Sequence, residues 1–312
     1  MKILSVLIEY GLNSLDREFS YLYEGKKRVE KGFRVRIPFA HQSIMGFVTH
    51  VEETSLSAEE LKQQNGYELL PIQEVVDEEP LLNEELLTLA DEVASYYLSP
   101  RISVLQAMLP PSLRPSLSSL SKPKIAYDTY VSVLDASEES LTPKQIEMVR
   151  LVSANEEILK KEAGSPDILK RLVSMGRLRL FKREKQRFQI PDYEREQPHD
   201  LNIEQQKAYD GILASPKEVI LLQGVTGSGK TEVYLHLSEA YLQQGKSILM
   251  MVPEISLTPV MVEYFSRRFG KQIAILHSGL TPSEKYDEYR RIARGEAKIV
   301  VGARSAVFAP LT

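Results

Sequence analysis

The sequence predicts a multidomain protein with three parts: a small β-rich DNA-binding domain, a winged-helix domain and an incomplete α/β lobe with a parallel sheet. Three observations predict this fold class. The 312 residues exceed the usual length of one domain. Prolines and serines cluster at 109–123 and at 191–198, as in linkers. A phosphate-binding loop (P-loop) motif occupies 224–231. The expected domains are 1–109, 110–198 (linker plus winged helix) and 199–312.

The composition excludes several classes of protein. Hydrophobic residues make up 43% and charged residues 26% of the chain, which excludes wholesale disorder. The longest apolar runs, at 219–222 and 248–252, are far shorter than the roughly 18–20 residues that span a bilayer, so we expect no membrane partner. Zero cysteines exclude disulfides and thiolate zinc sites within these residues. We expect a cytoplasmic protein, because Glu9 interrupts the only stretch that starts like a signal peptide.

Charge is distributed unevenly along the chain. Residues 52–92 hold thirteen acids against one base, whereas residues 158–190 hold ten bases against three acids. A local excess of positive charge of this size neutralises several phosphates. The middle of the chain is therefore predicted to be a basic module, although the whole chain carries a net charge of −4.

The first domain opens with short β-type runs and then changes to a helical period. The predicted strands lie at 3–9, 19–23, 33–39 and 44–51. Apolar residues then recur at helical spacing between 82 and 97. A small barrel or sheet closed by helices accounts for both patterns.

The middle domain is predicted to contain three helices and a hairpin. Thr142 and Gln145 form a capping box that begins the first helix, a second short helix covers 158–163, and the third ends at Gly176. Residues 178–181 and 188–190 are predicted to pair as a hairpin across a charged turn. This order is that of a winged helix, whose third helix enters the major groove. The DNA-contacting candidates in the wing are Lys182, Arg183 and Lys185. The alternative is a structural α+β module with a solvated basic face.

The last domain alternates strands and helices, which predicts βαβ units on a parallel sheet. The expected strands are 219–222, 247–252, 273–276 and 298–301, and the expected helices are 231–244, a segment that ends at Phe269, and 281–295.

The P-loop motif runs from Gly224 to Thr231, as GVTGSGKT. Its glycines let backbone N–H groups converge on phosphates at the positive end of a helix dipole. Lys230 is expected to reach the β- and γ-phosphates, and the Thr231 hydroxyl to bind Mg²⁺. Some P-loop enzymes phosphorylate small molecules, so a kinase that lacks DNA affinity remains an alternative.

Four runs of the last domain carry a more specific signal: 221–234 (LLQGVTGSGKTEVY), 252–259 (VPEISLTP), 277–280 (HSGL) and 302–310 (GARSAVFAP). They resemble motif I, motif Ia, a further landmark and a DNA-contacting run of the superfamily 2 helicases, specifically the primosomal replication-restart helicases. The resemblance is looser but continuous before residue 200. It implies a RecA-like lobe that uses ATP and Mg²⁺.

The resemblance assigns the nucleotide site to ten residues: Gln205, Gly224, Val225, Thr226, Gly227, Ser228, Gly229, Lys230, Thr231 and Glu232. Lys230 and Thr231 are the implied catalytic pair. Gln205 belongs to a run that resembles the adenine-recognising Q motif, although Asn202 and Gln205 also form a capping box. Arg304 is implied to contact the single-strand backbone, with a solvated charge at a strand end as the alternative.

The first domain is similar to the family's domain that holds the 3′ end of a nascent strand. The DNA-contacting candidates there are Phe19, Ser20, Pro38, Phe39 and Ala40. Phe19 and Phe39 offer stacking faces, with core aromatics as the alternative. The family usually has an acid at the position of Ser20, a glycine at that of Ala40 and a lysine at that of Leu70, so these departures indicate weaker or altered end recognition.

The resemblance also implies what the chain does. It predicts the N-terminal portion of a bacterial, nucleoid-associated 3′-to-5′ DNA helicase that binds forked and single-stranded DNA, the single-stranded-DNA-binding protein and primosome-loading proteins. The family's D-E-x-H acid and cysteine-rich zinc module would follow Thr312, so this portion is expected to bind nucleotide but to hydrolyse it at background rate. The alternative is a DNA-binding or protein-docking adaptor with a non-catalytic P-loop.

Overall fold

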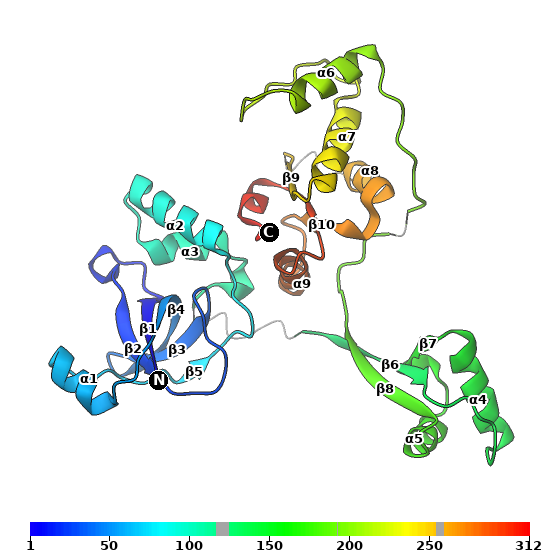
Figure 1. Cartoon of the computed structure of the whole chain (residues 1–312), viewed down its shortest axis with the longest axis horizontal. Helices are drawn as coiled ribbons and strands as arrows, with labels where there is room; N and C mark the ends of the chain where they lie inside the picture. The colour runs from blue at the N-terminus through cyan, green and yellow to red at the C-terminus, as the bar shows by residue number, and fades with distance from the viewer. Residues whose placement is uncertain (117–124, 192, 254–258) are drawn as a thin grey trace. The chain divides into compact units, whose positions relative to one another are not determined.

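The computed structural model describes residues 1–116, 125–191, 193–253 and 259–312. The chain divides into two compact units (Figure 1). One unit comprises residues 1–123 together with 188–312, and the other comprises 124–187. The first unit thus combines two segments that are far apart in the sequence. No helix among the described residues is both long and apolar enough to cross a membrane.

A five-stranded antiparallel sheet forms the N-terminal part, in the order β2-β1-β4-β3-β5. The strands are β1 (Lys2–Ile8), β2 (Phe19–Tyr23), β3 (Arg34–Phe39), β4 (Gln42–Glu53) and β5 (Glu74–Val75). The four strands predicted from alternating apolar residues are all confirmed. Their inward side chains, including Leu4, Val6 and Val35, form a core that excludes water.

The segment that precedes β5 closes this sheet into a small barrel. The Leu22 N–H donates to Leu70 O at 2.9 Å, and the Ile72 N–H donates to Leu22 O at 3.0 Å. The Gln73 N–H donates to Arg36 O at 2.8 Å. Residues 70–73 therefore bridge β2 and β3, and they cover the strand edges that would otherwise face solvent.

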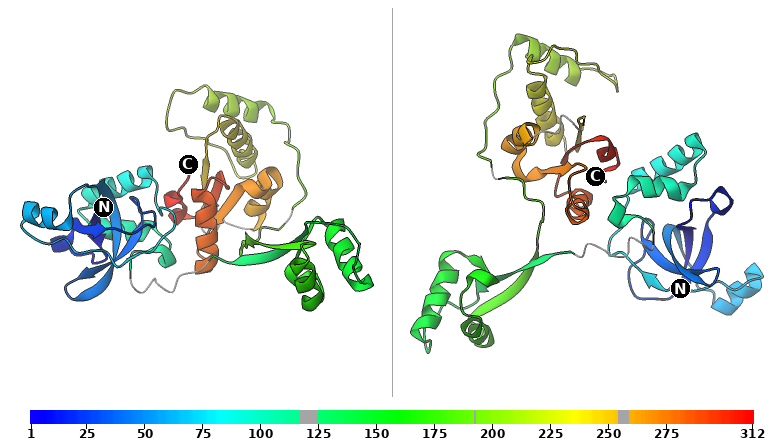
Figure 2. Two further views of the ribbon diagram at one scale, coloured as in Figure 1. Left: turned by 60° about the horizontal axis from the view of Figure 1, so that its bottom comes forward. Right: turned by 180° about the vertical axis from the view of Figure 1, so that it is seen from behind.

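Three helices accompany the barrel: α1 (Ala58–Asn65), α2 (Glu84–Tyr97) and α3 (Arg101–Met108). Helices α2 and α3 lie side by side (Figures 1 and 2) and share a second core with Leu7 and Phe47 of the sheet. The Asn83 side chain caps α2 by accepting a hydrogen bond from the Leu86 N–H. The predicted helical segment at 82–97 is confirmed.

A buried ion pair fixes the end of this part. Arg34 and Asp77 are almost fully buried and form two short contacts, Nη2 to Oδ1 at 2.6 Å and Nε to Oδ2 at 3.0 Å. Arg34 Nη1 also donates to the carbonyl oxygens of Ser112 and Arg114, at 3.4 and 3.5 Å. The pair thus ties β3 to the chain that leaves the domain.

The C-terminal part of the first unit is a parallel sheet with helices. The strands, in the order β10-β11-β9, are β9 (Ile248–Met251), β10 (Ile273–Leu276) and β11 (Ile299–Gly302). The helices are α6 (Ile203–Leu213), α7 (Lys230–Gln243), α8 (Pro259–Phe269) and α9 (Pro282–Ala293). These three strands, and the helices α7, α8 and α9, confirm the predicted alternation. Burial raises the pKa of Glu288 on α9, which accepts from the Ile275 N–H of β10.

The strand predicted at 219–222 is wrong. These residues pair with no strand among the described residues, and Val219 and Leu221 are 89% and 88% exposed. An apolar run becomes a strand only where a neighbouring strand supplies hydrogen-bond partners. Composition alone carries no information about that neighbour.

The second unit is a three-stranded antiparallel sheet with two helices on one face. The strands, in the order β7-β6-β8, are β6 (Tyr127–Val133), β7 (Glu157–Leu159) and β8 (Leu178–Glu184). The helices are α4 (Pro143–Ala154) and α5 (Pro166–Ser174). Their core includes Val131, Val152 and Leu172, which are fully buried. The predicted capping box is present, because the Thr142 N–H donates to Gln145 Oε1 at 2.8 Å.

Two predictions for this unit are wrong. The residues of the expected helix at 158–163 instead form the end of strand β7 followed by one 3-10 turn, Lys160–Glu162. The expected hairpin partner of β8 is also different, because β8 pairs with β6, which precedes both helices. Phe188 and Ile190 instead pack against the core of the parallel sheet in the first unit.

Within the first unit, α9 packs against the barrel helices. Tyr289 on α9 is buried among their apolar side chains, and its hydroxyl donates to Leu81 O at 2.7 Å. Burial raises the pKa of the Tyr289 phenol far above its ordinary value. Asn83 Nδ2 donates to Leu311 O at 2.9 Å, and Arg294 pairs with Glu79 at 3.0 Å. These contacts form the junction between the barrel and α9.

Candidate functional site

The P-loop is a compact turn that ends where α7 begins. Gly227 and Gly229 have φ angles of +82° and +77°, in the left-handed region that favours glycine. The Ser228 N–H donates to Val225 O at 3.2 Å and closes the turn. A Cβ at 229 would also collide with the Gln205 side chain, whereas the space beside Gly227 is open. Backbone conformation thus favours glycine at both positions, and a side chain at 229 would in addition displace the end of the Gln205 side chain.

Lys230 lies over the mouth of this loop. Its Nζ donates to Gly224 O at 2.6 Å and to Val225 O at 2.8 Å. The first N–H groups of α7 have no acceptor within the helix, so they are available to an anion. The Lys230 ammonium and these N–H groups therefore lie beside one another at the loop, and half-buried Thr231 follows Lys230 directly. Binding of phosphate by Lys230 and of Mg²⁺ by the Thr231 hydroxyl stay predictions.

Gln205 connects α6 to the P-loop. Its Nε2 donates to Ser228 O at 3.4 Å and to Gly229 O at 3.3 Å. Its Oε1 accepts from the Asn202 N–H at 2.8 Å, and Asn202 Oδ1 accepts from the Gln205 N–H at 2.9 Å. The capping-box alternative is confirmed. Recognition of adenine by Gln205 stays a prediction. The loop carbonyls already orient the Gln205 side chain.

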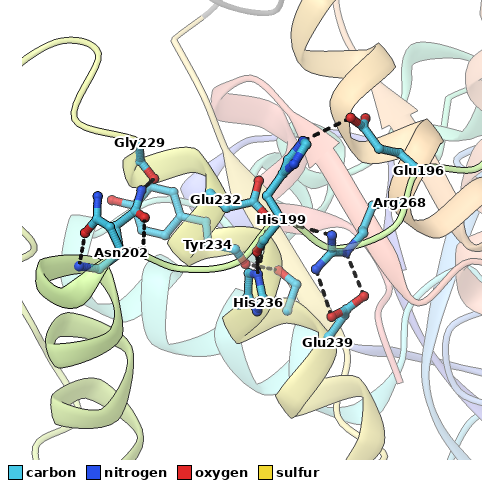
Figure 3. A network of polar contacts seen from close by, with 11 residues as sticks. Glu196, His199, Asn202, Gly229, Glu232, Tyr234, His236, Glu239 and Arg268 are labelled. Carbon is cyan, nitrogen blue, oxygen red and sulfur yellow. Dashed lines mark hydrogen bonds and ion pairs between the residues drawn. The ribbon is translucent and has the colours of Figure 1, made fainter.

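Behind the P-loop, Glu232 belongs to a network of charges that links α7 to α8 (Figure 3). The Arg268 side chain is 4% exposed and contacts Glu239 at 2.7 Å and Glu232 at 3.6 Å. His236 Nε2 lies 3.2 Å from Glu232 and 3.0 Å from His199 O. This network therefore holds the first turn of α7 against both α8 and the segment that precedes α6. A contact between Glu232 and nucleotide stays a prediction.

Apart from Glu232, which belongs to the run that resembles motif I, the network had no signal in the sequence. Arg268 is an ordinary basic residue near a helix C-terminus, and Glu232 and Glu239 are surface-type residues of an amphipathic helix. Only the packing of α8 on α7 brings the three charges together.

At the barrel, aromatic side chains gather around the start of β2 and the end of β3. The rings of Phe19 and Phe39 are 5.2 Å apart in an edge-to-face arrangement, and Tyr10 is 6.5 Å from Phe39. The Arg17 guanidinium carbon lies 5.0 Å from the centre of the Phe19 ring. Phe19 and Phe39 are half-buried against the barrel core. Each ring thus packs against the core on one side and stays partly accessible on the other. A core role and a stacking role for these aromatics are therefore compatible.

The other barrel candidates lie near this cluster in sequence and pairing. Ser20 is exposed on β2 and pairs with Ser5. Pro38 O accepts a hydrogen bond from the Tyr21 hydroxyl at 3.0 Å, and burial raises the pKa of Tyr21. Ala40 and His41 form the tight turn between β3 and β4 with φ angles of 46° and 64°. Sequence reasoning missed Tyr10 and Arg17, which no motif marks.

The three basic candidates in the second unit have different surroundings. Arg183 makes a bidentate pair with Glu157, at 2.5 and 2.9 Å. Lys185 lies 3.8 Å from Asp128. Lys182 is exposed on β8. Carboxylates therefore engage two of the three cations that the sequence assigned to phosphate contacts.

Arg304 is exposed after β11 and lines a cavity of about 440 Å³. The cavity lies between the end of the barrel domain and the C-terminal part of the same unit. Among the described residues its charged lining is cationic, with Arg114 and Lys285 beside Arg304 and no Asp or Glu, and the His277 ring lines it as well. Such a lining suits a phosphate-bearing chain. Sequence reasoning missed Arg114, and residues 254–258, which hold most of the predicted motif Ia, lie outside the described residues.

Two family matches cover most of the first unit. Residues 5–110 match the 3′DNA-binding domain (3′BD) of PriA, and residues 202–312 match the DEAD/DEAH box helicase family. The boundaries of the two matches enclose the barrel with α2 and α3, and the P-loop with the parallel sheet.

Curated relatives agree with both matches. The chain is 32% identical to the replication restart protein PriA of Bacillus subtilis (strain 168), over 99% of this chain and 47% of the relative. It is 31% identical to PriA of Haemophilus influenzae, over 99% of this chain and 42% of the relative. It is 50% identical to PriA of Treponema pallidum (strain Nichols), over 36% of this chain and 17% of the relative. The chain spans less than half the length of the first two relatives. It belongs to the PriA family of replication restart proteins.

Proposed function

We propose that this chain is the DNA-recognising and nucleotide-binding portion of an ATP-dependent 3′-to-5′ DNA helicase that restarts replication at stalled or branched forks. One observation carries the proposal: a 3′DNA-binding domain and a helicase-type P-loop occur in one chain and pack in one unit. A small-molecule kinase has no use for the first of these domains.

In this proposal each site residue has one task. Lys230 binds the β- and γ-phosphates, Thr231 holds Mg²⁺, and Gln205 recognises adenine. In the intact helicase, hydrolysis of the bound ATP supplies the free energy for movement along DNA. Arg304 contacts the backbone of the single strand, and Phe19 and Phe39 stack on the terminal nucleotide. The second unit acts as a winged-helix module on the duplex arm. The proposed protein partners are the single-stranded-DNA-binding protein and primosome-loading proteins at the bacterial nucleoid.

DNA-end recognition is tested with the intact 312-residue chain. We expect it to bind a forked DNA with a free 3′-OH about tenfold more tightly than the same fork with a 3′-phosphate, and we expect Phe39→Ala to abolish this difference. Tyr67→Ala is the matched control, because Tyr67 is an exposed aromatic of the same domain outside the cluster. Equal binding of both forks by the wild-type chain would overturn the end-recognition role.

The nucleotide site is tested by titrating a fluorescent ATP analogue with Mg²⁺ into the wild-type chain and Lys230→Ala. Loss of binding in the variant supports the helicase assignment. Equal binding by both supports the second candidate, an adaptor whose P-loop is not catalytic. That candidate has one observation in its favour, since the segment before the loop is exposed and unpaired among the described residues.

A further inference from the structure

The sheet of the second unit has one face that none of the described helices covers. Side chains alternate between two faces of a strand, and the helices pack on the face that carries Val131, Ile158 and Leu178. The opposite face, called the open face below, carries the other set of side chains from the three strands: Asp128, Tyr130, Ser132, Glu157, Leu159, Arg179, Phe181 and Arg183.

At the centre of the open face, planar groups lie against one another. The rings of Tyr130 and Phe181 are stacked, with centres 5.8 Å apart and an angle of 23°. The Arg183 guanidinium lies 4.9 Å from the centre of the Tyr130 ring. Arg179 and Arg183 each lie 5.7 Å from the Phe181 ring. Neither arginine is buried, and Phe181 is only half-buried.

The two arginines offer different chemistry. Glu157 takes two N–H donors of Arg183, which holds that guanidinium in place and leaves it to act as a flat cationic face. Arg179 instead donates its Nε to Ser132 Oγ at 2.8 Å, and none of its contacts in the described part of the chain is with a carboxylate. Arg179 therefore keeps donors for a phosphate.

The charge around the open face indicates which kind of ligand it binds. From 177 to 187, along β8 and its flanks, six residues are basic and one is acidic, so the edge of the open face is cationic. Aromatic rings and arginine planes beside positive charge match the two features of an unpaired nucleotide, a flat base and a phosphate. A duplex offers only phosphates here, because its bases are already stacked.

We propose that the open face binds single-stranded DNA, with one base added to the stack of Phe181, Tyr130 and Arg183 and its phosphate bound by Arg179. This rests on the proposed function insofar as the chain acts on DNA, but it assigns a second single-strand site in a different unit from the 3′DNA-binding domain. It also changes the role of Arg183 from a phosphate contact to a stacking surface.

The chain contains no tryptophan, which permits a direct test. Phe181→Trp introduces one indole into the stack, and base stacking quenches indole fluorescence. We use the full chain with a circular single-stranded oligothymidylate, which has no 3′ end for the barrel to bind. We expect quenching with the same midpoint as the binding curve measured by anisotropy. Leu180→Trp is the matched control, because Leu180 directly precedes Phe181 on β8, is 41% exposed and, as the partner of Val131, lies on the opposite face.

Three outcomes with the Phe181→Trp variant would overturn the proposal. The first is binding of the circle without quenching of the indole fluorescence. The second is equal quenching by a blunt duplex, which would mean contact with phosphates alone. The third is a change of the indole emission with protein concentration in the absence of DNA, which would assign the face to a second copy of the chain.

A substitution completes the test. Phe181→Ala is expected to weaken binding of the circle about tenfold, while Leu180→Ala changes it less than about twofold. Preference for a free 3′-OH over a 3′-phosphate is expected to be unchanged in both. Loss of that preference alone would count against the proposed function but not against the single-strand site on the open face. Unchanged affinity of Phe181→Ala for the circle would contradict the single-strand site.

Discussion

The junction between the barrel and α9 differs from the P-loop segment in how its side chains are packed. Tyr289 at the junction is 3% exposed, whereas Val219 and Leu221 before the loop are 89% and 88% exposed. Both regions belong to the same unit. The difference separates two kinds of structural information. The loop is defined by local backbone conformation, while the junction is defined by contacts between residues about two hundred positions apart.

The largest expected effect comes from breaking the buried pair on the packed side of this comparison. Asp77→Ala leaves the Arg34 guanidinium buried without a counter-charge, so we expect the free energy of unfolding to fall by about 3–5 kcal/mol. Urea denaturation followed by circular dichroism measures it. The control is Glu74→Ala, whose partner Arg36 is 3.6 Å away and solvent-accessible, and about 0–1 kcal/mol is expected. Equal losses in the two variants would contradict the packing described here.

A smaller change probes the junction itself. Tyr289→Phe removes the hydroxyl that donates to Leu81 O and leaves that carbonyl without its partner. We expect a loss of about 1–2 kcal/mol in the free energy of unfolding. Tyr264→Phe on α8 is the control, since that ring is 48% exposed, and its effect should stay within about 0.5 kcal/mol. A junction that contributes nothing to stability would show no difference between the two.

The barrel turn tests whether local strain persists beside a well-packed core. Ala40 has a φ of 46°, which costs an alanine roughly 1–2 kcal/mol relative to allowed regions. Ala40→Gly relieves this strain but also raises the conformational entropy of the unfolded chain. We therefore expect the free energy of unfolding to rise by up to about 1 kcal/mol. Ala240→Gly inside α7 is the control and should lower stability by about 1 kcal/mol. A loss of stability in both variants would show that Ala40 is unstrained.

The sequence predicted most strongly what depends on local pattern. Alternating apolar residues located β1 to β4, and capping boxes located α4 and α9. The P-loop glycines were recognised because a left-handed backbone conformation favours glycine. Strand pairing is not indicated by any comparable residue preference. Strand β6 alternates Thr129, Val131 and Val133 and was missed after the proline-rich and serine-rich stretch at 109–123. Its pairing with β8 replaced the expected hairpin.

The candidate sites divide in the same way. Lys230 and Gln205 were found from motifs, and each makes contacts with the P-loop. Arg268, Arg114 and the stack of Tyr130 on Phe181 were missed, because each depends on which elements pack or pair. Glu157 lies 26 residues before Arg183 and still decides whether that arginine is available to phosphate.

The smallest expected effect lies on the open side of the comparison. Leu221→Ser removes an apolar side chain that is 88% exposed, so little burial is lost and we expect a change within about 0.5 kcal/mol in the free energy of unfolding. Nucleotide binding should also be unchanged, because the left-handed glycines and Lys230 define the loop without help from position 221. Leu235→Ser on α7 is the control. That side chain is 4% exposed in the core of the parallel sheet, and its truncation to a polar group should cost about 2–5 kcal/mol. Comparable losses in the two variants, measured by urea denaturation, would mean that residues 219–222 are packed after all, and the contrast between loop and junction would disappear.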